Sequence, residues 1–207
     1  MILGIDEAGR GPVIGPLTLC GVWVSDHGQR KLRKLGIKDS KAFGSSDRAR
    51  RERARLAGEV RLAATHITLL CVDAAEVDRR VRLGELNLLE QELAEAVIRD
   101  GPEAHRIVAD GERLFSPLAE RHPRLRARNK ADQTSVAVAA ASIVAKHERD
   151  TLFAEIAARY EPEFGPLGGG GYINPATETF LLAYFHRYRE LPSEVRRSWS
   201  WQLLQDL

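Results

Sequence analysis

Short apolar runs, each bounded by turn-forming residues, predict β-strands over the first two thirds of the chain. The predicted strands cover residues 2–5, 17–24, 65–72 and 106–109, with a brief last strand at Leu125. These segments are rich in the branched side chains that favour extended structure. The glycines and prolines between residues 9 and 16 predict a loop between the first two strands.

Periodic apolar positions predict helices between and after these strands. We expect helices over roughly 47–63, 85–99 and 175–188, with Ser45 or Ser46 as the N-cap of the first. A further helix begins near Ser135, and its apolar or small residues follow helical spacing at Val136, Ala139, Ala140, Ile143, Val144 and His147. This order of elements predicts an α/β fold with a mixed sheet and a C-terminal helical region.

The composition is that of an ordinary globular domain and excludes several classes of protein. A chain of 207 residues fits one domain, residues 1–207, and can bury a core that needs no disulfide. No apolar run reaches membrane-spanning length, and the first residues do not resemble a signal peptide, so we expect a cytoplasmic monomer. Cys20 and Cys71 lie in apolar segments, where we expect both to be buried packing residues.

Charge and histidine patterns add little by themselves. The net charge is only +2, although Lys and Arg cluster around residues 30–55, 121–130 and 187–197. Such clusters are more often solvated faces than nucleic-acid tracks, so they give mild support for an anionic partner. The six histidines show no paired spacing that would bind zinc.

Acidic side chains stand at the ends of predicted elements. Asp6 and Glu7 follow the first strand, Asp110 follows the fourth, and Asp132 precedes the helix that begins near Ser135. Carboxylates gathered in this way repel one another unless cations neutralise them, and oxygen ligands select Mg²⁺ or Mn²⁺. Each acid could instead be a helix cap, a surface charge or half of an ion pair.

The motifs that contain these acids resemble those of the ribonuclease HII family. The first is Gly4-Ile5-Asp6-Glu7-Ala8-Gly9-Arg10-Gly11-Pro12 with Gly15-Pro16, a long and specific opening signature. The others follow in the family's order as Asp39-Ser40-Lys41, Ala109-Asp110-Gly111, Lys130-Ala131-Asp132 with residues 139–150, Gly169-Gly170-Gly171-Tyr172 with residues 175–181, and Val195-Arg196-Arg197-Ser198-Trp199. The resemblance therefore extends from residue 4 to residue 199.

The resemblance implies a ribonuclease H-like fold, with a five-stranded mixed sheet flanked by helices and a C-terminal helical part. A catalytic part would cover about residues 1–160 and a helical substrate-binding part about 161–207. It also implies that Asp6, Glu7, Asp110 and Asp132 are catalytic and bind two divalent ions, with Asp6 touching both. Asp150 competes with Asp132 for the fourth position, but the family pattern favours Asp132.

The resemblance also implies how RNA is recognised. Gly9, Arg10 and Gly11 would present backbone groups to a 2′-hydroxyl, and Tyr172 would pack against the neighbouring sugar. Alternatively, the glycines only form a turn and the tyrosine packs in the core. The sequence departs from the family pattern with Ile173-Asn174 after the tyrosine and a run of glycines before it. The candidates for phosphate contacts are Lys41, Lys130 and Lys146.

The expected activity is endonucleolytic hydrolysis of RNA paired with or joined to DNA. The partners would be RNA–DNA hybrids and duplex DNA that contains ribonucleotides, cut on the 5′ side of the ribonucleotide to leave 3′-hydroxyl and 5′-phosphate ends. Alternatives are a ribonuclease HIII-like enzyme, which typically has lysine where Arg10 stands, and a catalytically silent hybrid-binding module. The tail from Trp201 to Leu207 also resembles a sliding-clamp peptide weakly.

Overall fold

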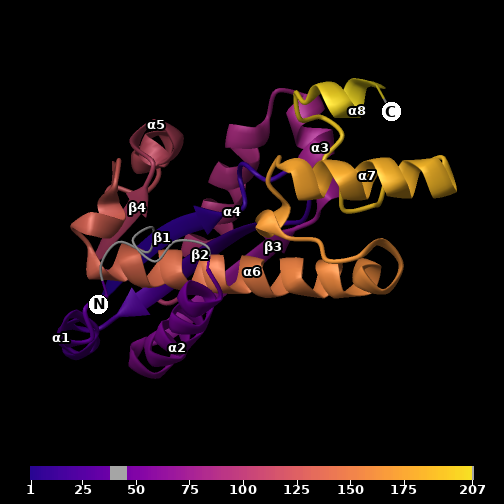
Figure 1. Cartoon of the computed structure of the whole chain (residues 1–207). Helices are drawn as coiled ribbons and strands as arrows, with labels where there is room; N and C mark the ends of the chain where they lie inside the picture. Colours follow the sequence, from indigo (N-terminus) through magenta and orange to yellow (C-terminus); the bar gives the residue numbers. More distant parts are fainter. Residues whose placement is uncertain (38–45, 207) are drawn as a thin grey trace. The chain divides into compact units, whose positions relative to one another are not determined.

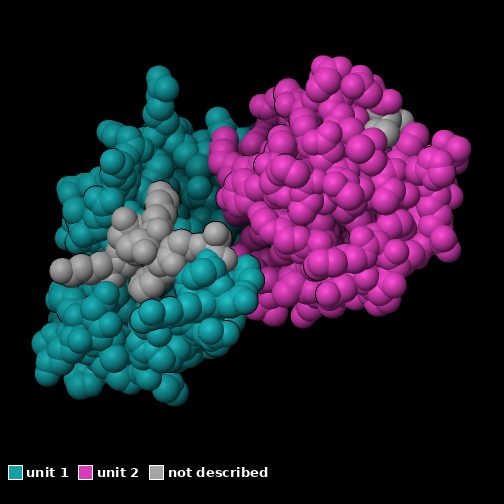
Figure 2. All heavy atoms as spheres, in the orientation of Figure 1, with its two compact units in different colours: residues 1–8, 18–70, 87–147 teal, residues 9–17, 71–86, 148–207 magenta. Residues whose placement is uncertain are grey.

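A computed structural model describes residues 1–37 and 46–206 (Figure 1). Lys41 and Ser45, and with them the second motif, lie outside the described residues. Contacts between Cα atoms divide the chain into two compact units (Figure 2). Unit 1 comprises residues 1–8, 18–70 and 87–147, and unit 2 comprises residues 9–17, 71–86 and 148–207.

The strands form the predicted mixed sheet, in the order β3-β2-β1-β4-β5. Their bounds are Ile2–Ala8 for β1, Leu17–Val24 for β2, His66–Val72 for β3, Arg106–Asp110 for β4 and Leu125–Arg128 for β5. Strand β1 pairs antiparallel with β2 and parallel with β4, and β4 pairs parallel with β5. The carboxyl ends of β1, β4 and β5 therefore meet at one edge of the sheet.

The long helix α6, Val136–Phe164, begins in unit 1, where it packs directly on β1. A Cβ atom at Gly4 would lie 2.1 Å from the carbonyl carbon of Ala137, so only glycine fits there. Ala139, Ala140 and Ala141 on the same helix are fully buried. Small side chains on both elements bring the helix against the strand, as the sequence predicted.

The other predicted helices are confirmed within one residue at each end. Helix α2 covers Asp47–Ala63, and its N-cap Ser46 accepts a hydrogen bond from the amide of Ala49 at 3.2 Å. Helix α4 covers Leu86–Asp100, and α7 covers Pro175–Tyr188 with Asn174 as its N-cap. Short pieces complete the chain: α5 Glu112–Phe115, α8 Gln202–Asp206, and the 3-10 turns η2 Ser116–Glu120, η3 Ala131–Gln133 and η4 Gly169–Gly171.

Helices α1 and α3 are among the described elements that were not predicted. Helix α1 covers Asp26–Lys34 and α3 covers Ala74–Arg82, with Ser25 and Asp73 as their respective N-caps. Both are short and mostly polar, so their apolar positions are too few to show a clear period. The N-cap residues Ser25 and Asp73 are the feature of the sequence from which these two helices could have been predicted.

Unit 2 has a core of its own. It is formed by the fully or largely buried side chains of Val13, Ile14, Phe153, Ile156, Leu167, Phe180, Leu181 and Val195. Beside it, Tyr160, Phe164, Tyr184 and Phe180 make edge or tilted ring contacts at centroid distances between 5.1 and 6.0 Å. These aromatic contacts join the end of α6 to α7.

One prediction about the cysteines was wrong. Cys20 is buried in β2, but Cys71 in β3 is exposed. An apolar strand residue can face solvent because alternate side chains of a strand point to opposite sides. Within the described residues, no helix is both long enough and apolar enough to cross a membrane.

Candidate active site

Asp6 and Glu7 lie within β1, near its carboxyl end. The strand continues through both acids to Ala8, so it does not end before them as the apolar pattern suggested. Because alternate side chains point to opposite faces, Asp6 shares the face of Gly4, on which α6 packs. Asp6 is only 6% exposed, while Glu7 is half-buried.

The pairing of β1 with β4 brings Asp110 beside Asp6. Ile5 is in register with Ala109, so the next residue of each parallel strand is an acid. Asp110 is the last residue of β4, and its Oδ1 atom accepts a hydrogen bond from the amide of Ala131 at 3.0 Å. That bond ties the segment that carries Asp132 to the same sheet edge.

Asp132 lies in the 3-10 turn η3, just before α6. Lys130 precedes the turn with a positive φ of 56°, and Asp132 itself is 3% exposed. Its Oδ1 atom is buried and accepts no hydrogen bond from the described part of the chain, although the residue has other polar interactions. The turn therefore holds a second buried acid near the carboxyl end of β4.

Electrostatics couple three of the four acids. Burial raises the pKa of Asp6 well above its ordinary value, and the charges of Glu7 and Asp110 raise it further. Hydrogen bonds from the Ser142 hydroxyl and from the Glu7 amide, the latter at 3.0 Å, lower the pKa in part. The net repulsion favours a bound cation, and carboxylate oxygens are the ligands that Mg²⁺ and Mn²⁺ prefer.

The described residues contain no three Asp, Glu, His or Cys side chains already arranged to hold one metal ion. The joint role of Asp6, Glu7, Asp110 and Asp132 therefore stays a prediction. The structure brings the first three close enough for their charges to interact, and it links the fourth through Ala131. Asp150 lies farther along α6, in unit 2.

A second group of predicted residues gathers in unit 2, and we call it the recognition turn: Gly9, Arg10, Gly11 and Tyr172. Gly9 adopts a φ of 91°, and a Cβ atom there would lie 2.5 Å from the Pro16 carbonyl oxygen. Arg10 and Gly11 are exposed. A Cβ atom on Gly11 would lie 3.3 Å from Cε1 of Tyr172, whose side chain is 54% exposed. The tyrosine therefore flanks the turn at the surface and does not pack in the core.

The unusual residues around Tyr172 fix its backbone. Gly171 has a φ of 74°, and its carbonyl accepts hydrogen bonds from the amides of Val13 and Ile14 at 2.8 and 3.1 Å. The Tyr172 carbonyl accepts bonds from Asn174 Nδ2 at 2.7 Å and Thr177 Oγ1 at 2.8 Å. The asparagine that departs from the family pattern thus positions the tyrosine and also caps α7.

The positions of the predicted lysines say less about phosphate binding. Lys130 is exposed beside Asp132, and Lys146 is half-buried in α6. The sequence reasoning missed the role of Ser142, which bonds to Asp6. It also missed the buried arginines behind the recognition turn, Arg149 and Arg196. Ser142 and Arg149 could have been found from their positions on the apolar face of α6. Polar residues are seldom fully buried, so one on such a face indicates a specific bonding role.

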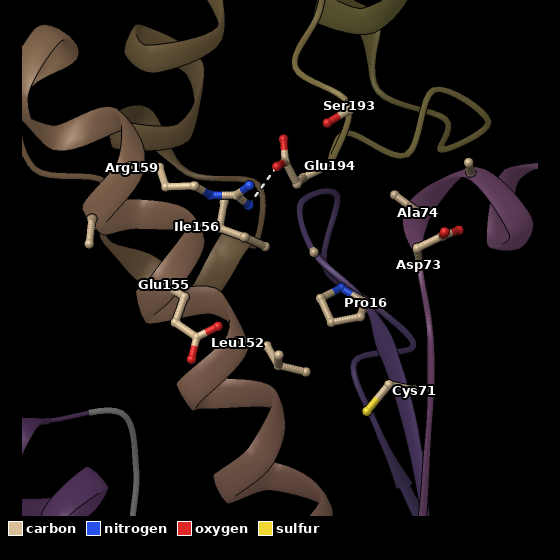
Figure 3. A pocket seen from close by; sticks show the side chains of 13 residues that line it. Pro16, Cys71, Asp73, Ala74, Leu152, Glu155, Ile156, Arg159, Ser193 and Glu194 are labelled. Atoms are coloured by element: carbon tan, nitrogen blue, oxygen red, sulfur yellow. Dashed lines mark hydrogen bonds and ion pairs between the residues drawn. The ribbon is translucent and has the colours of Figure 1, made fainter.

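Unit 2 also contains a cavity of about 900 Å³ (Figure 3). Its walls include Pro16, Leu152 and Ile156, with Cys71 at one end. Arg159 donates a hydrogen bond to Glu194 at 2.6 Å at the other end. None of the predicted site residues lines this cavity, so it is separate from the candidate site.

The mixed sheet, with acids at the shared carboxyl edge of β1 and β4, has the arrangement expected of the ribonuclease H-like fold. The sequence model of the family described as Ribonuclease HII matches residues 3–202. Ribonuclease HII from Methanothermobacter thermautotrophicus is 39% identical over 210 residues, which cover 96% of this chain and 96% of that protein.

Two solved structures extend the likeness to three dimensions. The ribonuclease H2 of Pyrococcus horikoshii is similar with a TM-score of 0.83 at 28% identity, covering 99% of this chain and 95% of that one. Ribonuclease HII from Archaeoglobus fulgidus, solved as a complex with PCNA, gives a TM-score of 0.79 at 37% identity and covers 100% of both chains.

The chain belongs to the ribonuclease HII family. It is accordingly a metal-dependent endoribonuclease with ribonuclease H activity on RNA–DNA hybrids. This assignment confirms the predicted family, fold class and enzyme class, and it favours ribonuclease HII over its sibling ribonuclease HIII.

Proposed function

We propose that Asp6, Glu7, Asp110 and Asp132 bind two divalent cations, Mg²⁺ or Mn²⁺, with Asp6 contacting both. The observation that supports this is the raised pKa of the buried Asp6 carboxyl, which follows from its burial and from the nearby charges of Glu7 and Asp110. A buried group of like charges is costly without cations, and its oxygen atoms suit hard ions. The donor set therefore fits the metal dependence of the family.

The chain's own groups would prepare the phosphodiester for hydrolysis. Asp6, Glu7, Asp110 and Asp132 would hold the divalent cations, which would supply a more acidic water and positive charge to offset that of the phosphate. The Ser142 hydroxyl orients Asp6, and the Ala131 amide orients Asp110. Water adds to phosphorus and the bond to the 3′-oxygen breaks, which leaves a 3′-hydroxyl and a 5′-phosphate.

We further propose that the recognition turn selects the ribonucleotide. Gly9, Arg10 and Gly11 would contact the 2′-hydroxyl through their backbone, and Tyr172 would pack against the adjoining sugar. The exposure of Gly11 and of the Tyr172 ring, which flanks it, supports this role. Cleavage would then occur 5′ of one ribonucleotide in duplex DNA.

The remaining parts of the proposal concern organisation. Residues 1–207 would act as one ribonuclease HII domain and as a monomer. Its catalytic part would be about residues 1–160, with a helical substrate-binding part at about 161–207. Lys41, Lys130 and Lys146 would contact phosphates; of these, the exposed position of Lys130 beside Asp132 is the best supported.

The test uses duplexes with one, two or four ribonucleotides, with Mg²⁺ or Mn²⁺ as the metal. We expect cleavage 5′ of the single ribonucleotide by the natural protein, and a loss of at least about a thousandfold in Asp6→Asn with duplex binding retained. Near-normal turnover by Asp6→Asn would contradict the acid assignment. Hybrid binding without cleavage by the natural protein would instead favour a silent binding module.

The C-terminal tail supports a weaker proposal, that a sliding clamp binds residues 201–207. The A. fulgidus relative was solved in a complex with PCNA. Here Gln202 bonds to Asp206 at 2.8 Å, and Trp201, Leu203 and Leu204 pack partly against the core of unit 2. Clamp binding would have to replace these contacts. A pull-down with and without residues 200–207 tests it, and equal capture would count against it.

A further inference from the structure

Arg196 is a fully buried cation that donates one hydrogen bond to the recognition turn, at Arg10, and another to the nearby Gly15. Its side chain is 0% exposed, its Nε atom donates to the Gly15 carbonyl at 3.0 Å, and its Nη1 atom donates to the Arg10 carbonyl at 3.3 Å. Burial lowers the pKa of its guanidinium to about 10, so the group keeps its charge at neutral pH. A buried charge is costly unless it is well bonded, so a residue of this kind needs a specific reason to be there.

Trp199, three residues after Arg196, makes a second contact with the recognition turn. Its ring lies under the Arg196 guanidinium, 4.9 Å from ring centroid to Cζ, and its Nε1 atom donates to the Gly11 carbonyl at 3.0 Å. Asp78 fixes the intervening backbone, because its carboxylate accepts bonds from the amides of Arg197 and Ser198 at 2.8 and 3.0 Å. The segment is therefore a rigid support on which two successive carbonyls of the turn rest.

The direction of these bonds determines what the turn presents. In a trans peptide the C=O and the N–H point in opposite directions, and the described residues contain no cis peptide bond. The Arg10 carbonyl faces Arg196, so the Gly11 amide hydrogen points the other way. The Gly11 carbonyl faces Trp199, and its peptide carries no N–H because Pro12 follows. The Arg196 bond thus orients the Gly11 amide as a donor, and the Trp199 bond holds the peptide that follows it in place.

We propose that Arg196 and Trp199 are positioning residues that aim the Gly11 amide at the ribose 2′-hydroxyl and so determine whether one ribonucleotide is enough for cleavage. This inference rests on the proposed role of the recognition turn. A single ribonucleotide has one 2′-hydroxyl at one position of the duplex, so its cleavage depends on the exact direction of the Gly11 amide. A long hybrid offers a ribose in every register and depends on that direction less.

The decisive variant is Trp199→Phe, which keeps an aromatic ring beside Arg196 but removes the donor to the Gly11 carbonyl together with part of the ring. We expect kcat/KM on a single-ribonucleotide duplex to fall about two- to tenfold, the range for one lost hydrogen bond, and kcat/KM on a long hybrid to change less than about twofold. Arg196→Lys, which keeps the charge and loses the fork of donors, should give a larger loss in the same direction.

The matched control is Trp23→Phe in unit 1, which also removes an indole donor to a carbonyl, that of Pro102 at 2.6 Å. It should lower the melting temperature without changing the ratio of the two kcat/KM values. An unchanged ratio in Trp199→Phe, or an equal loss on both substrates, would overturn the inference. If the natural protein cuts long hybrids but never the single-ribonucleotide duplex, the proposed function of the turn has failed instead.

Discussion

Asp6 in unit 1 and Arg196 in unit 2 are buried charges of opposite sign, and their surroundings differ. In unit 1 the buried Asp6 faces other acids, and its pKa is raised by burial and by Glu7 and Asp110. In unit 2 the buried Arg149 donates to the Ile14 carbonyl at 2.9 Å and stacks over Phe153, while Arg196 donates to the Arg10 carbonyl of the recognition turn. Backbone carbonyls and aromatic rings can stabilise a buried cation from within the protein. A buried acid beside other acids is instead stabilised by keeping its proton or by a bound cation.

A similar degree of burial of a charged side chain can therefore serve two purposes. Arg149 and Arg196 of unit 2 donate to backbone carbonyls of the chain itself. The charges of Glu7 and Asp110 in unit 1 disfavour ionisation of Asp6, and a bound cation would relieve that repulsion. Removing an acid should therefore affect activity most, and altering the turn should affect stability and recognition.

After Asp6→Asn, the variant expected to affect catalysis most is Asp132→Asn. The change keeps the shape of the buried side chain and removes its charge, so we expect a loss of at least about a hundredfold in kcat with little change in fold. Asp150→Asn is the control, because Asp150 lies in unit 2 and should leave kcat within about twofold. A large loss of kcat in Asp150→Asn and none in Asp132→Asn would show that Asp150, and not Asp132, is the fourth catalytic acid.

A smaller effect is expected on stability, from Gly171→Ala. A Cβ atom there would lie 2.4 Å from the Ile14 carbonyl oxygen, at a residue with a φ of 74°. We expect a loss of about 2–4 kcal/mol in the free energy of unfolding, from strain and overpacking together. Gly165→Ala is the control, with a φ of 77° but nothing within 4 Å, and should cost about 1–2 kcal/mol. Equal losses in urea denaturation would show that the close approach is unimportant.

The smallest effect is a pH dependence of stability caused by Asp6. Its pKa is raised in the folded protein by burial and by Glu7 and Asp110, so the folded state retains a proton that the unfolded state releases. Stability without metal should fall as pH rises from the ordinary Asp pKa through the raised one. Asp6→Asn should be less pH-dependent there and more stable at neutral pH in EDTA. A variant less stable than the natural protein at neutral pH would reverse this account.

Much of the fold followed from the sequence because strand and helix periods were clear. The strands were located, and α2 was predicted at the observed bounds because Ser46 caps a regular pattern. The polar helices α1 and α3 were missed for lack of apolar positions. Cys71 was placed in the core because the sequence does not reveal which face of β3 is exposed.

The residues of the candidate site were predicted from their motifs, but the residues that contact and position them were not. The register of β1 with β4 explains why acids that are 104 positions apart, Asp6 and Asp110, share a sheet edge. Nothing local in the sequence indicates that Trp199 contacts the carbonyl of Gly11, 188 positions away. Such contacts depend on the tertiary fold, so neither periodicity nor spacing reveals them.

The contact between Gly4 and Ala137 has a consequence for how the enzyme can change over time. Both partners are main chain, and main chain has no alternative rotamers, so the spacing between β1 and α6 does not depend on which apolar side chains fill the rest of the core. No change of rotamer could therefore make room for a side chain at Gly4. A substitution there would have to push α6 away from β1, and with it Ser142 away from Asp6.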